Sequence, residues 1–107
     1  MWYFIYAEDI PNSNALRQEA RPMHVERLKK LQDENRLLLA GPFPAIDSLD
    51  PKDAGFTGST IIAKFDSLEE AQKWAMDDPY WNHGVYKANT GIVKPFKITV
   101  KMNDASF

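Results

Sequence analysis

His24 is the side chain in this sequence that is best suited to proton transfer near neutral pH. It recurs with Leu28 and Leu31 at helical spacing, which predicts that its ring points toward a sheet rather than into bulk water. Pro22 is typical of the first turn of a helix, so we expect a helix over residues 22–35 with His24 near its N-terminus. The positive end of the helix dipole would there disfavour imidazolium and leave a neutral ring that can accept a proton. A histidine on an apolar helical face is more often a hydrogen-bonded core residue than a catalyst, and that alternative stays open.

Asp78 is the second candidate for proton chemistry. A carboxylate that accepts a hydrogen bond from one imidazole nitrogen would fix the tautomer of the ring and stabilise the imidazolium formed during turnover. The position of Asp78 directly before Pro79 is also typical of a turn residue that ends a helix. Taken alone, the residue pattern favours this structural role.

Aromatic and hydroxyl side chains could complete a site for a planar ligand. Tyr80, Trp81 and Tyr86 could line a pocket, or they could pack in the core or against a partner subunit. Ser59 opens an expected strand, where it could bind a substrate through a hydrogen bond or simply begin the strand. No oxyanion-loop signature accompanies Ser59, so we do not expect a serine nucleophile.

Several other chemistries lack the residues that they require. The sequence contains no cysteine, which excludes thiolate nucleophiles, disulfides and Cys-ligated zinc or iron–sulfur sites. His83 could join His24 and an aspartate around a metal, but their spacing fits no zinc signature. No glycine-rich phosphate loop is present either. We therefore expect neither a metal nor a cofactor.

The composition is that of a folded domain with balanced charge. The 107 residues are 44% hydrophobic and 26% charged, and 13 basic and 15 acidic side chains give a formal net charge of −2. The nearest approach to a basic patch is formed by Arg27, Lys29 and Lys30, which acidic neighbours balance, and we interpret it as a solvated helix face. Without a basic face, we do not expect nucleic-acid binding.

The apolar segment that opens the chain does not have the pattern of a secretory signal. It lacks a basic n-region and ends at Glu8 and Asp9. No apolar stretch approaches the ~20 residues that a membrane-spanning helix needs. We expect a cytoplasmic protein without a membrane partner.

Strands and helices that would position these residues follow from apolar spacing and from end signals. A capping box formed by Ser67 and Glu70 opens a second helix, which we expect to stop before Pro79. Pro95 cannot donate to a sheet, so the last strand should lie at an edge or carry a bulge. Strands are expected at residues 2–7, 37–40, 59–65 and 91–101, helices at 22–35 and from 68 onward, and a loop at 44–57.

The expected order of elements is β-α-β-β-α-β, the split pattern of a ferredoxin-like α+β domain. Two helices then cover one face of an antiparallel sheet and leave the other face bare. The strand at residues 2–7 is apolar on both faces, so the bare face would be apolar as well and would mark an interface. We therefore expect residues 1–107 to form a single domain that works as a homodimer.

Short motifs are spread along the chain in an order that is more specific than any one of them. They are Arg21-Pro22-Met23-His24, Leu37-Leu38-Leu39-Ala40-Gly41-Pro42, Gly58-Ser59-Thr60, Asp78-Pro79-Tyr80, Gly91 and Pro95-Phe96. Together they resemble the YciI-like family over residues 1–100. Phe96 departs from the tryptophan that many relatives carry, which should alter the pocket or the packing slightly.

The resemblance implies a ferredoxin-like βαββαβ dimer whose two sheets pack face to face, a dimeric α+β barrel. It also implies a histidine–aspartate pair in a pocket, which corresponds to His24 and Asp78 in this sequence. Relatives that it suggests include a dehydrochlorinase of chlorinated hydroxyhydroquinones and, more distantly, muconolactone isomerases.

Three functions are compatible with these residues. The first is a cofactor-independent lyase or isomerase, in which His24 and Asp78 abstract a proton from a small cyclic or aromatic substrate bound by Ser59 and the aromatic residues named above. The second is a dimeric module that binds a metabolite or regulates without catalysis. The third is a structural dimer in which the pair is merely a buried hydrogen bond. Replacing His24 would abolish turnover in the first case, weaken ligand binding in the second and lower stability in the third.

Overall fold

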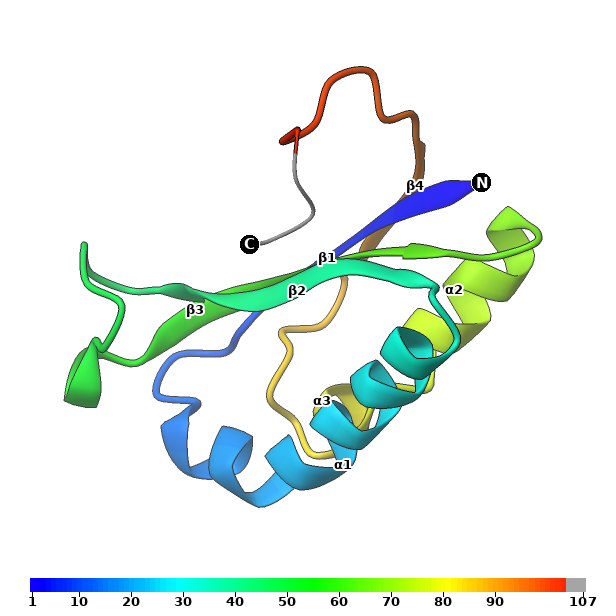
Figure 1. Cartoon of the computed structure of the whole chain (residues 1–107). Helices are drawn as coiled ribbons and strands as arrows, with labels where there is room; N and C mark the ends of the chain where they lie inside the picture. The colour runs from blue at the N-terminus through cyan, green and yellow to red at the C-terminus, as the bar shows by residue number, and fades with distance from the viewer. Residues whose placement is uncertain (104–107) are drawn as a thin grey trace.

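A computed structural model describes residues 1–103 as a four-stranded sheet with helices on one face (Figure 1). The strand order is β2-β3-β1-β4 and every neighbouring pair is antiparallel. This is the expected ferredoxin-like α+β fold, with one short helix, α3, added to the expected elements. The elements are β1 (Trp2–Glu8), α1 (Asn14–Asp33), β2 (Leu37–Pro44), the 3₁₀-helix η1 (Lys52–Ala54), β3 (Phe56–Lys64), α2 (Leu68–Met76), α3 (Pro79–Asn82) and β4 (Ile92–Phe96).

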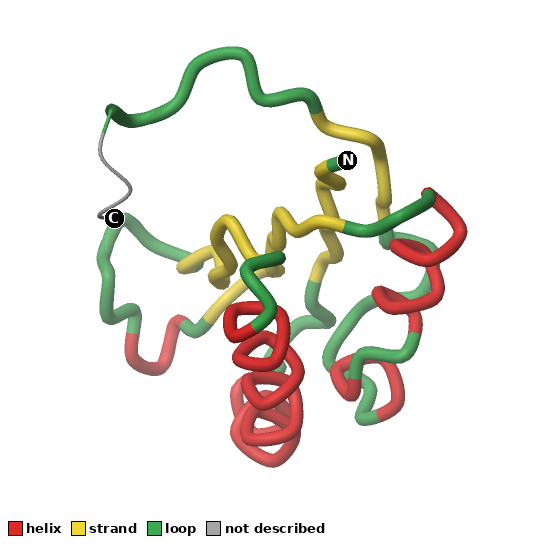
Figure 2. Tube along the Cα trace, turned by 45° about the vertical axis from the view of Figure 1, so that its right-hand side comes forward, coloured by secondary structure: helices red, strands yellow, loops and turns green. Residues whose placement is uncertain are grey.

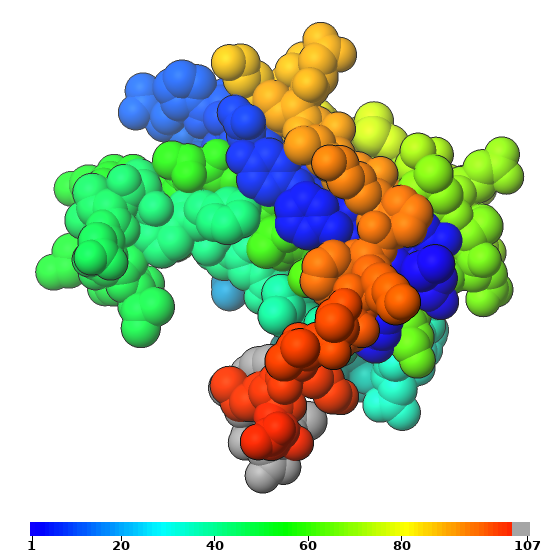
Figure 3. Space-filling model, turned by 90° about the horizontal axis from the view of Figure 1, so that it is seen from above, coloured from blue at the N-terminus to red at the C-terminus, as the bar shows by residue number. Residues whose placement is uncertain are grey.

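The central strand β1 separates two apolar layers. Tyr3 and Ile5 are buried beneath the helices, in a core that also holds Leu31 and Phe65. The alternate residues of β1, among them Phe4, are only half-buried on the opposite face. That face is seen from above in Figure 3, where β1 is dark blue and β4 orange. The two-sided apolar pattern of β1 therefore reflects one face covered by helices and one that this chain covers only in part.

Helix α1 begins at Asn14 and not at residue 22, so the expected start of this helix was wrong. Pro22 lies inside the helix, although a proline there removes one intrahelical hydrogen bond. The N-cap is Ser13, whose hydroxyl makes no capping bond because it donates to Asp9 Oδ2 at 2.5 Å. His24 consequently lies in the middle of α1, and the expected effect of a helix N-terminus on its ring does not apply.

The C-terminus of α1 is closed by a Schellman motif, which directs the chain into β2. Asn35 adopts a left-handed conformation with φ 57°. The N–H of Asn35 donates to Gln32 O at 3.0 Å, and that of Arg36 donates to Leu31 O at 2.9 Å. These two bonds satisfy carbonyls that a helix end would otherwise leave free.

Strands β2, β3 and β4 differ from the prediction in their bounds. β2 extends to Pro44 and β3 begins at Phe56, so both ends of the expected loop at 44–57 belong to strands. The 3₁₀-helix η1 lies within that loop. β4 ends at Phe96, which pairs with Trp2, the first residue of β1, and not at residue 101 as expected. After Phe96 the chain leaves the sheet on the side opposite to the helices (Figures 1 and 2). The edge position expected for the last strand is confirmed.

The capping box of α2 is present with one difference. The N–H of Glu70 donates to Ser67 Oγ at 3.1 Å, while the carboxylate of Glu70 accepts from the N–H of Asp66 rather than from that of Ser67. The helix ends at Met76, before Pro79, as predicted. Of the helices within residues 1–103, none is both long and apolar enough to cross a membrane.

Candidate active site

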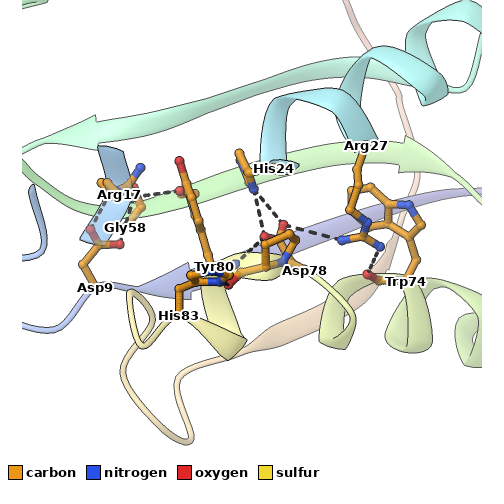
Figure 4. A network of polar contacts seen from close by, with 11 residues as sticks. Asp9, Arg17, His24, Arg27, Gly58, Trp74, Asp78, Tyr80 and His83 are labelled. Carbon is orange, nitrogen blue, oxygen red and sulfur yellow. Dashed lines mark hydrogen bonds and ion pairs between the residues drawn. The ribbon is translucent and has the colours of Figure 1, made fainter. Parts of the chain in front are cut away.

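His24 and Asp78 are in direct contact, although they lie 54 residues apart in the sequence (Figure 4). Nδ1 of His24 is 2.9 Å from Oδ1 and 2.8 Å from Oδ2 of Asp78. His24 extends from the middle of α1, and Asp78 is the N-cap of α3. Both side chains are buried, with 9% and 4% of their surfaces exposed.

The position of Asp78 combines the two roles that its sequence context allows. Its Oδ1 accepts the N–H of Tyr80 at 2.9 Å, so the carboxylate caps α3 as a turn residue would. The same carboxylate faces His24. Because an ionised carboxylate can only accept hydrogen bonds, Nδ1 of His24 must donate, and the neutral ring then carries its free lone pair on Nε2.

Arg27 lies beside this pair and is not part of a solvated helix face, so that interpretation was wrong for Arg27. Its Nη2 donates to Trp74 O at 2.6 Å, and its guanidinium lies 4.2 Å from the centre of the Trp74 ring. Nη1 is 3.8 Å from Asp78 Oδ2. Burial lowers the pKa of Arg27, and the charge of Asp78 opposes that effect. Helix α2 supplies the carbonyl and the ring that draw Arg27 out of solvent.

On the other side of His24, three side chains form a stack. The ring of Tyr80 lies 3.9 Å from the imidazole at an interplanar angle of 5°. The guanidinium carbon of Arg17 lies 5.1 Å from the centre of the Tyr80 ring and 5.3 Å from the centre of the Phe56 ring. Figure 4 shows Tyr80 between Arg17 and His24. We call Arg17, Tyr80 and His24 the Arg17–Tyr80–His24 stack.

Arg17 also forms a second buried acid–base pair, with Asp9. Its Nε donates to Asp9 Oδ2 at 2.6 Å and its Nη2 to Asp9 Oδ1 at 2.8 Å. Nη2 further contacts Gly58 O at 3.1 Å and Ser59 Oγ at 2.9 Å. Burial lowers the pKa of Arg17, but the hydrogen bonds and charge of Asp9 outweigh it and raise the pKa above its ordinary value. A side chain at Gly58 would collide with Ala7 O, since an added Cβ would lie 2.5 Å from that oxygen.

No sequence motif marks the Asp9–Arg17 pair, and neither residue was predicted to belong to the site. Asp9 marks the end of an apolar run, and Arg17 lies before the helix that was expected over residues 22–35. Arg17 and His24 nevertheless lie about two turns apart on one helix face. Extending the helix back to Asn14 would have placed Arg17 beside His24.

Two cavities meet at this network, and the predicted site residues divide between them. The larger cavity, ≈ 760 Å³, is lined by His24, Tyr80 and Ser59 among others. The smaller cavity, ≈ 370 Å³, is lined by Asp78, Ser59, Trp81 and Tyr86 among others. Ser59 borders both. The residues predicted to bind a substrate therefore do not line one common pocket.

Trp81 and Tyr86 pack closely with Tyr80. The ring centres of Tyr86 and Tyr80 are 5.4 Å apart, and those of Trp81 and Tyr86 are 5.1 Å apart, both in edge-to-face arrangements. Tyr80 and Tyr86 are buried in a second hydrophobic cluster, separate from the main core. Burial raises the pKa of the Tyr86 phenol, and the charge of Asp78 raises it further.

His83 has a local structural contact. It is the C-cap of α3, and its Nδ1 lies 3.0 Å from Pro79 O. Throughout residues 1–103, no group of three or more His, Asp and Glu side chains is arranged to hold a metal ion.

Comparison with known proteins gives a consistent set of relatives. The model of the YCII-related domain matches residues 1–97. An uncharacterized protein of Haemophilus influenzae is 57% identical over 97 residues, which is 91% of this chain and 97% of the relative. Protein YciI of Escherichia coli and that of Shigella flexneri are each 58% identical over the same shares of both chains.

One solved structure extends the comparison to a characterised activity. It is 5-chloro-2-hydroxyhydroquinone dehydrochlorinase from Burkholderia phenoliruptrix in complex with 2,5-dihydroxybenzoquinone. The sequences are 26% identical, the TM-score is 0.76, and the match covers 91% of this chain and 94% of the dehydrochlorinase chain. Fold and sequence are thus similar over nearly the whole length of both chains.

Proposed function

This chain belongs to the YCII-related domain family, and from that premise we propose that it is a small-molecule enzyme of the lyase or isomerase type. The dehydrochlorinase of similar fold supports this reaction class, since loss of hydrogen chloride is an elimination. His24 serves as the general base and Asp78 as the group that orients it. The substrate is a small cyclic or aromatic molecule, and the reaction needs no cofactor.

The observation that carries the proposal is the arrangement around the imidazole of His24. Asp78 engages Nδ1 with both carboxylate oxygens, and Nε2 has no hydrogen-bond partner among residues 1–103. His24 lines a cavity of ≈ 760 Å³, which is large enough for a small organic ligand. A base with an oriented, unprotonated nitrogen at the wall of a cavity is suited to proton abstraction.

The proposed step balances as an elimination. Nε2 of His24 accepts a proton from a tetrahedral ring carbon, which a phenolic substrate offers in its keto tautomer, and the electron pair of the broken C–H bond forms a new C=C bond. The leaving group departs from the neighbouring carbon with its own bonding pair, as chloride does from a chlorinated substrate. The imidazolium then releases its proton to water. In an isomerisation, the proton would instead return to another carbon of the same molecule.

The surroundings favour the imidazolium that this step creates. The carboxylate of Asp78 lies 2.8 Å from Nδ1 and would stabilise the positive ring. The face of Tyr80, at 3.9 Å, would add a cation–π attraction. Arg27 holds a positive charge 3.8 Å from Oδ2 of Asp78, which weakens the attraction between the carboxylate and the ring.

Chloride release from 5-chloro-2-hydroxyhydroquinone, followed by proton abstraction from a panel of small cyclic compounds, tests the proposal. We expect His24→Gln to lower kcat by about 10²–10⁴-fold while circular dichroism stays unchanged. His83→Gln is the matched control, because the hydrogen bond of His83 is to Pro79 O of its own short helix and His83 lines neither cavity. A wild-type protein that binds these compounds without converting any of them would overturn the enzyme proposal and favour the alternative, a metabolite-binding module.

We also propose that a second copy of the chain covers the free face of the sheet. Aromatic rings continue across this face, with Phe4 and Tyr6 stacked at 6.2 Å and Tyr6 and Phe43 at 5.7 Å. Phe43 and Phe96 are each 38% exposed. Apolar surface of this kind marks an interface in small proteins. The face therefore has the chemistry of a homodimer interface.

Analytical ultracentrifugation tests this assembly. We expect a dimer for the wild type and a monomer for Phe43→Asp, because a charge would be buried between the sheets. Leu49→Asp is the control, since Leu49 is 99% exposed in the loop between β2 and η1. A monomeric wild type at tens of micromolar concentration would contradict the proposal.

A further inference from the structure

Three polar groups on the wall of the larger cavity have no protein partner among residues 1–103. They are Nε2 of His24, Nη1 of Arg17 and the hydroxyl of Tyr80, each of which lies on a residue that lines this cavity. Nη1 of Arg27 is the one fully enclosed side-chain nitrogen or oxygen of the described residues that lacks a partner. The other three groups are not fully enclosed, so a ligand in the larger cavity could reach them.

We propose that Arg17 and Tyr80 form a subsite for an ionised substrate oxygen, a carboxylate or an enolate, next to the base His24. The proposal deepens the proposed function, on which it rests for the role of the cavity. It assigns the substrate class as a planar, monocyclic anion. It also assigns Arg17 and Tyr80 a part in recognising that anion.

Two nitrogens of the Arg17 guanidinium make hydrogen bonds within the protein, and the third is left for a ligand. Nε and Nη2 are occupied by Asp9, Gly58 and Ser59, which fixes the plane of the group. Nη1 retains two N–H donors, and a rigid guanidinium loses little entropy when such donors bind an oxyanion. Arg17 is thus held in place before any ligand arrives.

The hydroxyl of Tyr80 supplies a second donor. Tyr80 is 1% exposed and lines the larger cavity, so its unpaired hydroxyl has little contact with water outside that cavity. Burial raises the pKa of this phenol, whereas the charges of Arg17 and Arg21 oppose that effect, and the net pKa lies above the ordinary value. The phenol is therefore neutral at pH 7 and can donate. A buried hydroxyl without a partner is costly, and an anionic ligand would remove that cost.

The charges that line the two cavities favour the larger one for an anion. Arg21 and Lys52 line the larger cavity together with Arg17, while Asp50 and Asp53 line it at the η1 loop. Arg17 and Arg21 lie one turn apart on α1, on the wall that also carries His24. The described lining of the smaller cavity includes no Lys or Arg and contains the carboxylate of Asp78.

The stack sets the spacing between anion and base. Arg17 and His24 lie on opposite sides of one Tyr80 ring, at 5.1 Å and 3.9 Å from its centre. A planar substrate that lies along the edge of the Arg17–Tyr80–His24 stack could place an ionised oxygen at Arg17 and a C–H group at His24. If that oxygen is conjugated with the carbon that loses its proton, the two donors would also stabilise the charge that develops.

NMR titrations of the protein with benzoate and with benzamide test the subsite. The two probes share size and planarity but differ in charge. We expect benzoate to bind at least tenfold more tightly than benzamide, and Tyr80→Phe to weaken benzoate about tenfold while leaving benzamide unchanged. Tyr3→Phe is the matched control, because Tyr3 is a buried tyrosine of the main core that lines neither cavity.

Tyr80→Phe keeps the stacked ring, so the test does not depend on variants of Arg17, which could fail to fold. Equal affinity for the two probes, no detectable binding of benzoate, or unchanged benzoate affinity in Tyr80→Phe would each overturn the subsite. Benzoate binding that depends on Tyr80 in a protein without turnover would contradict the enzyme proposal alone. Turnover in a protein that shows no preference for benzoate would contradict the subsite alone.

Discussion

Helix α1 carries two buried acid–base pairs that resemble each other in construction. Arg17 and His24 lie about two turns apart on one face of the helix. Each contacts both carboxylate oxygens of an aspartate that lies outside the helix, Asp9 for Arg17 and Asp78 for His24. One face of Tyr80 stacks on His24, and the ring also contacts Arg17.

The two pairs differ in what they leave free. Arg17 joins the end of β1, helix α1 and strand β3 through bonds to Asp9, Gly58 and Ser59. Its guanidinium stays charged at any ordinary pH and cannot act as a base. His24 is held by one nitrogen and keeps the other. The same buried arrangement thus gives a structural clamp with one residue type and a candidate base with the other.

Of the changes considered, removal of Arg17 should lower the stability of the fold the most. We expect Arg17→Met to lower the free energy of unfolding by about 3–5 kcal/mol, because Asp9 would stay buried without its partner. Urea denaturation followed by circular dichroism measures this change. The double variant Asp9→Leu/Arg17→Met should recover part of the loss. A loss below about 1 kcal/mol in the single variant would show that Arg17 is no clamp.

Asp78→Asn should be less costly. The amide oxygen can still accept the N–H of Tyr80, but the charge that pairs with His24 and Arg27 is lost. We expect a decrease of about 1–3 kcal/mol in the free energy of unfolding, measured by the same denaturation. Asp77→Asn, at the neighbouring exposed position, is the control and should change little. An equal loss of unfolding free energy in Asp78→Asn and Asp77→Asn would contradict a stabilising role for the buried charge of Asp78.

Stability at alkaline pH tests the burial of Tyr80 and Tyr86 beside these pairs. Burial raises the pKa of Tyr80 and Tyr86 above the ordinary 10.0, so the folded chain holds these protons more tightly than the unfolded chain. Stability from this source is complete below pH 10 and is lost as pH rises above it. We expect Tyr86→Phe to flatten the decline in unfolding free energy above pH 10. Parallel declines in the wild type and the variant would contradict the burial of this phenol.

Tyr80→Phe should have the smallest effect on stability. The variant keeps the ring that contacts Arg17 and His24 and removes a hydroxyl that has no partner within residues 1–103. We expect the free energy of unfolding not to fall, and to rise by at most about 1 kcal/mol in thermal or urea denaturation, because the variant lacks the unpaired hydroxyl. A loss of several kcal/mol would assign the hydroxyl a structural bond and argue against its role in the cavity.

Much of the fold could be predicted from local patterns, because alternation and capping act over a few residues. The apolar face of β1 and the cap at Ser67 are of this kind. The start of α1 could not be predicted in the same way. Pro22 is a typical first-turn residue, and Ser13 makes no capping bond because its hydroxyl is used by Asp9. Tertiary contacts decided where this helix begins.

The candidate site divides similarly. His24 is conspicuous because imidazole on an apolar helix face is unusual chemistry, and its contact with Asp78 agrees with what the family resemblance implied. Arg17 is not conspicuous, because an arginine in a polar segment has no special pattern. Its partner Asp9 directly follows β1, and the carbonyl of Gly58 lies in β3. Such a set becomes visible only when the chain is folded.

The tautomer of His24 is the property on which the catalytic proposal depends most directly. Long-range ¹H–¹⁵N NMR spectra of the neutral ring distinguish a protonated Nδ1 from a protonated Nε2. The contact with Asp78 at 2.8 Å predicts a proton on Nδ1 and a free lone pair on Nε2 in the wild type. It also predicts that Asp78→Asn alters this balance. A wild-type ring that carries its proton on Nε2 would contradict the assignment of His24 as the base.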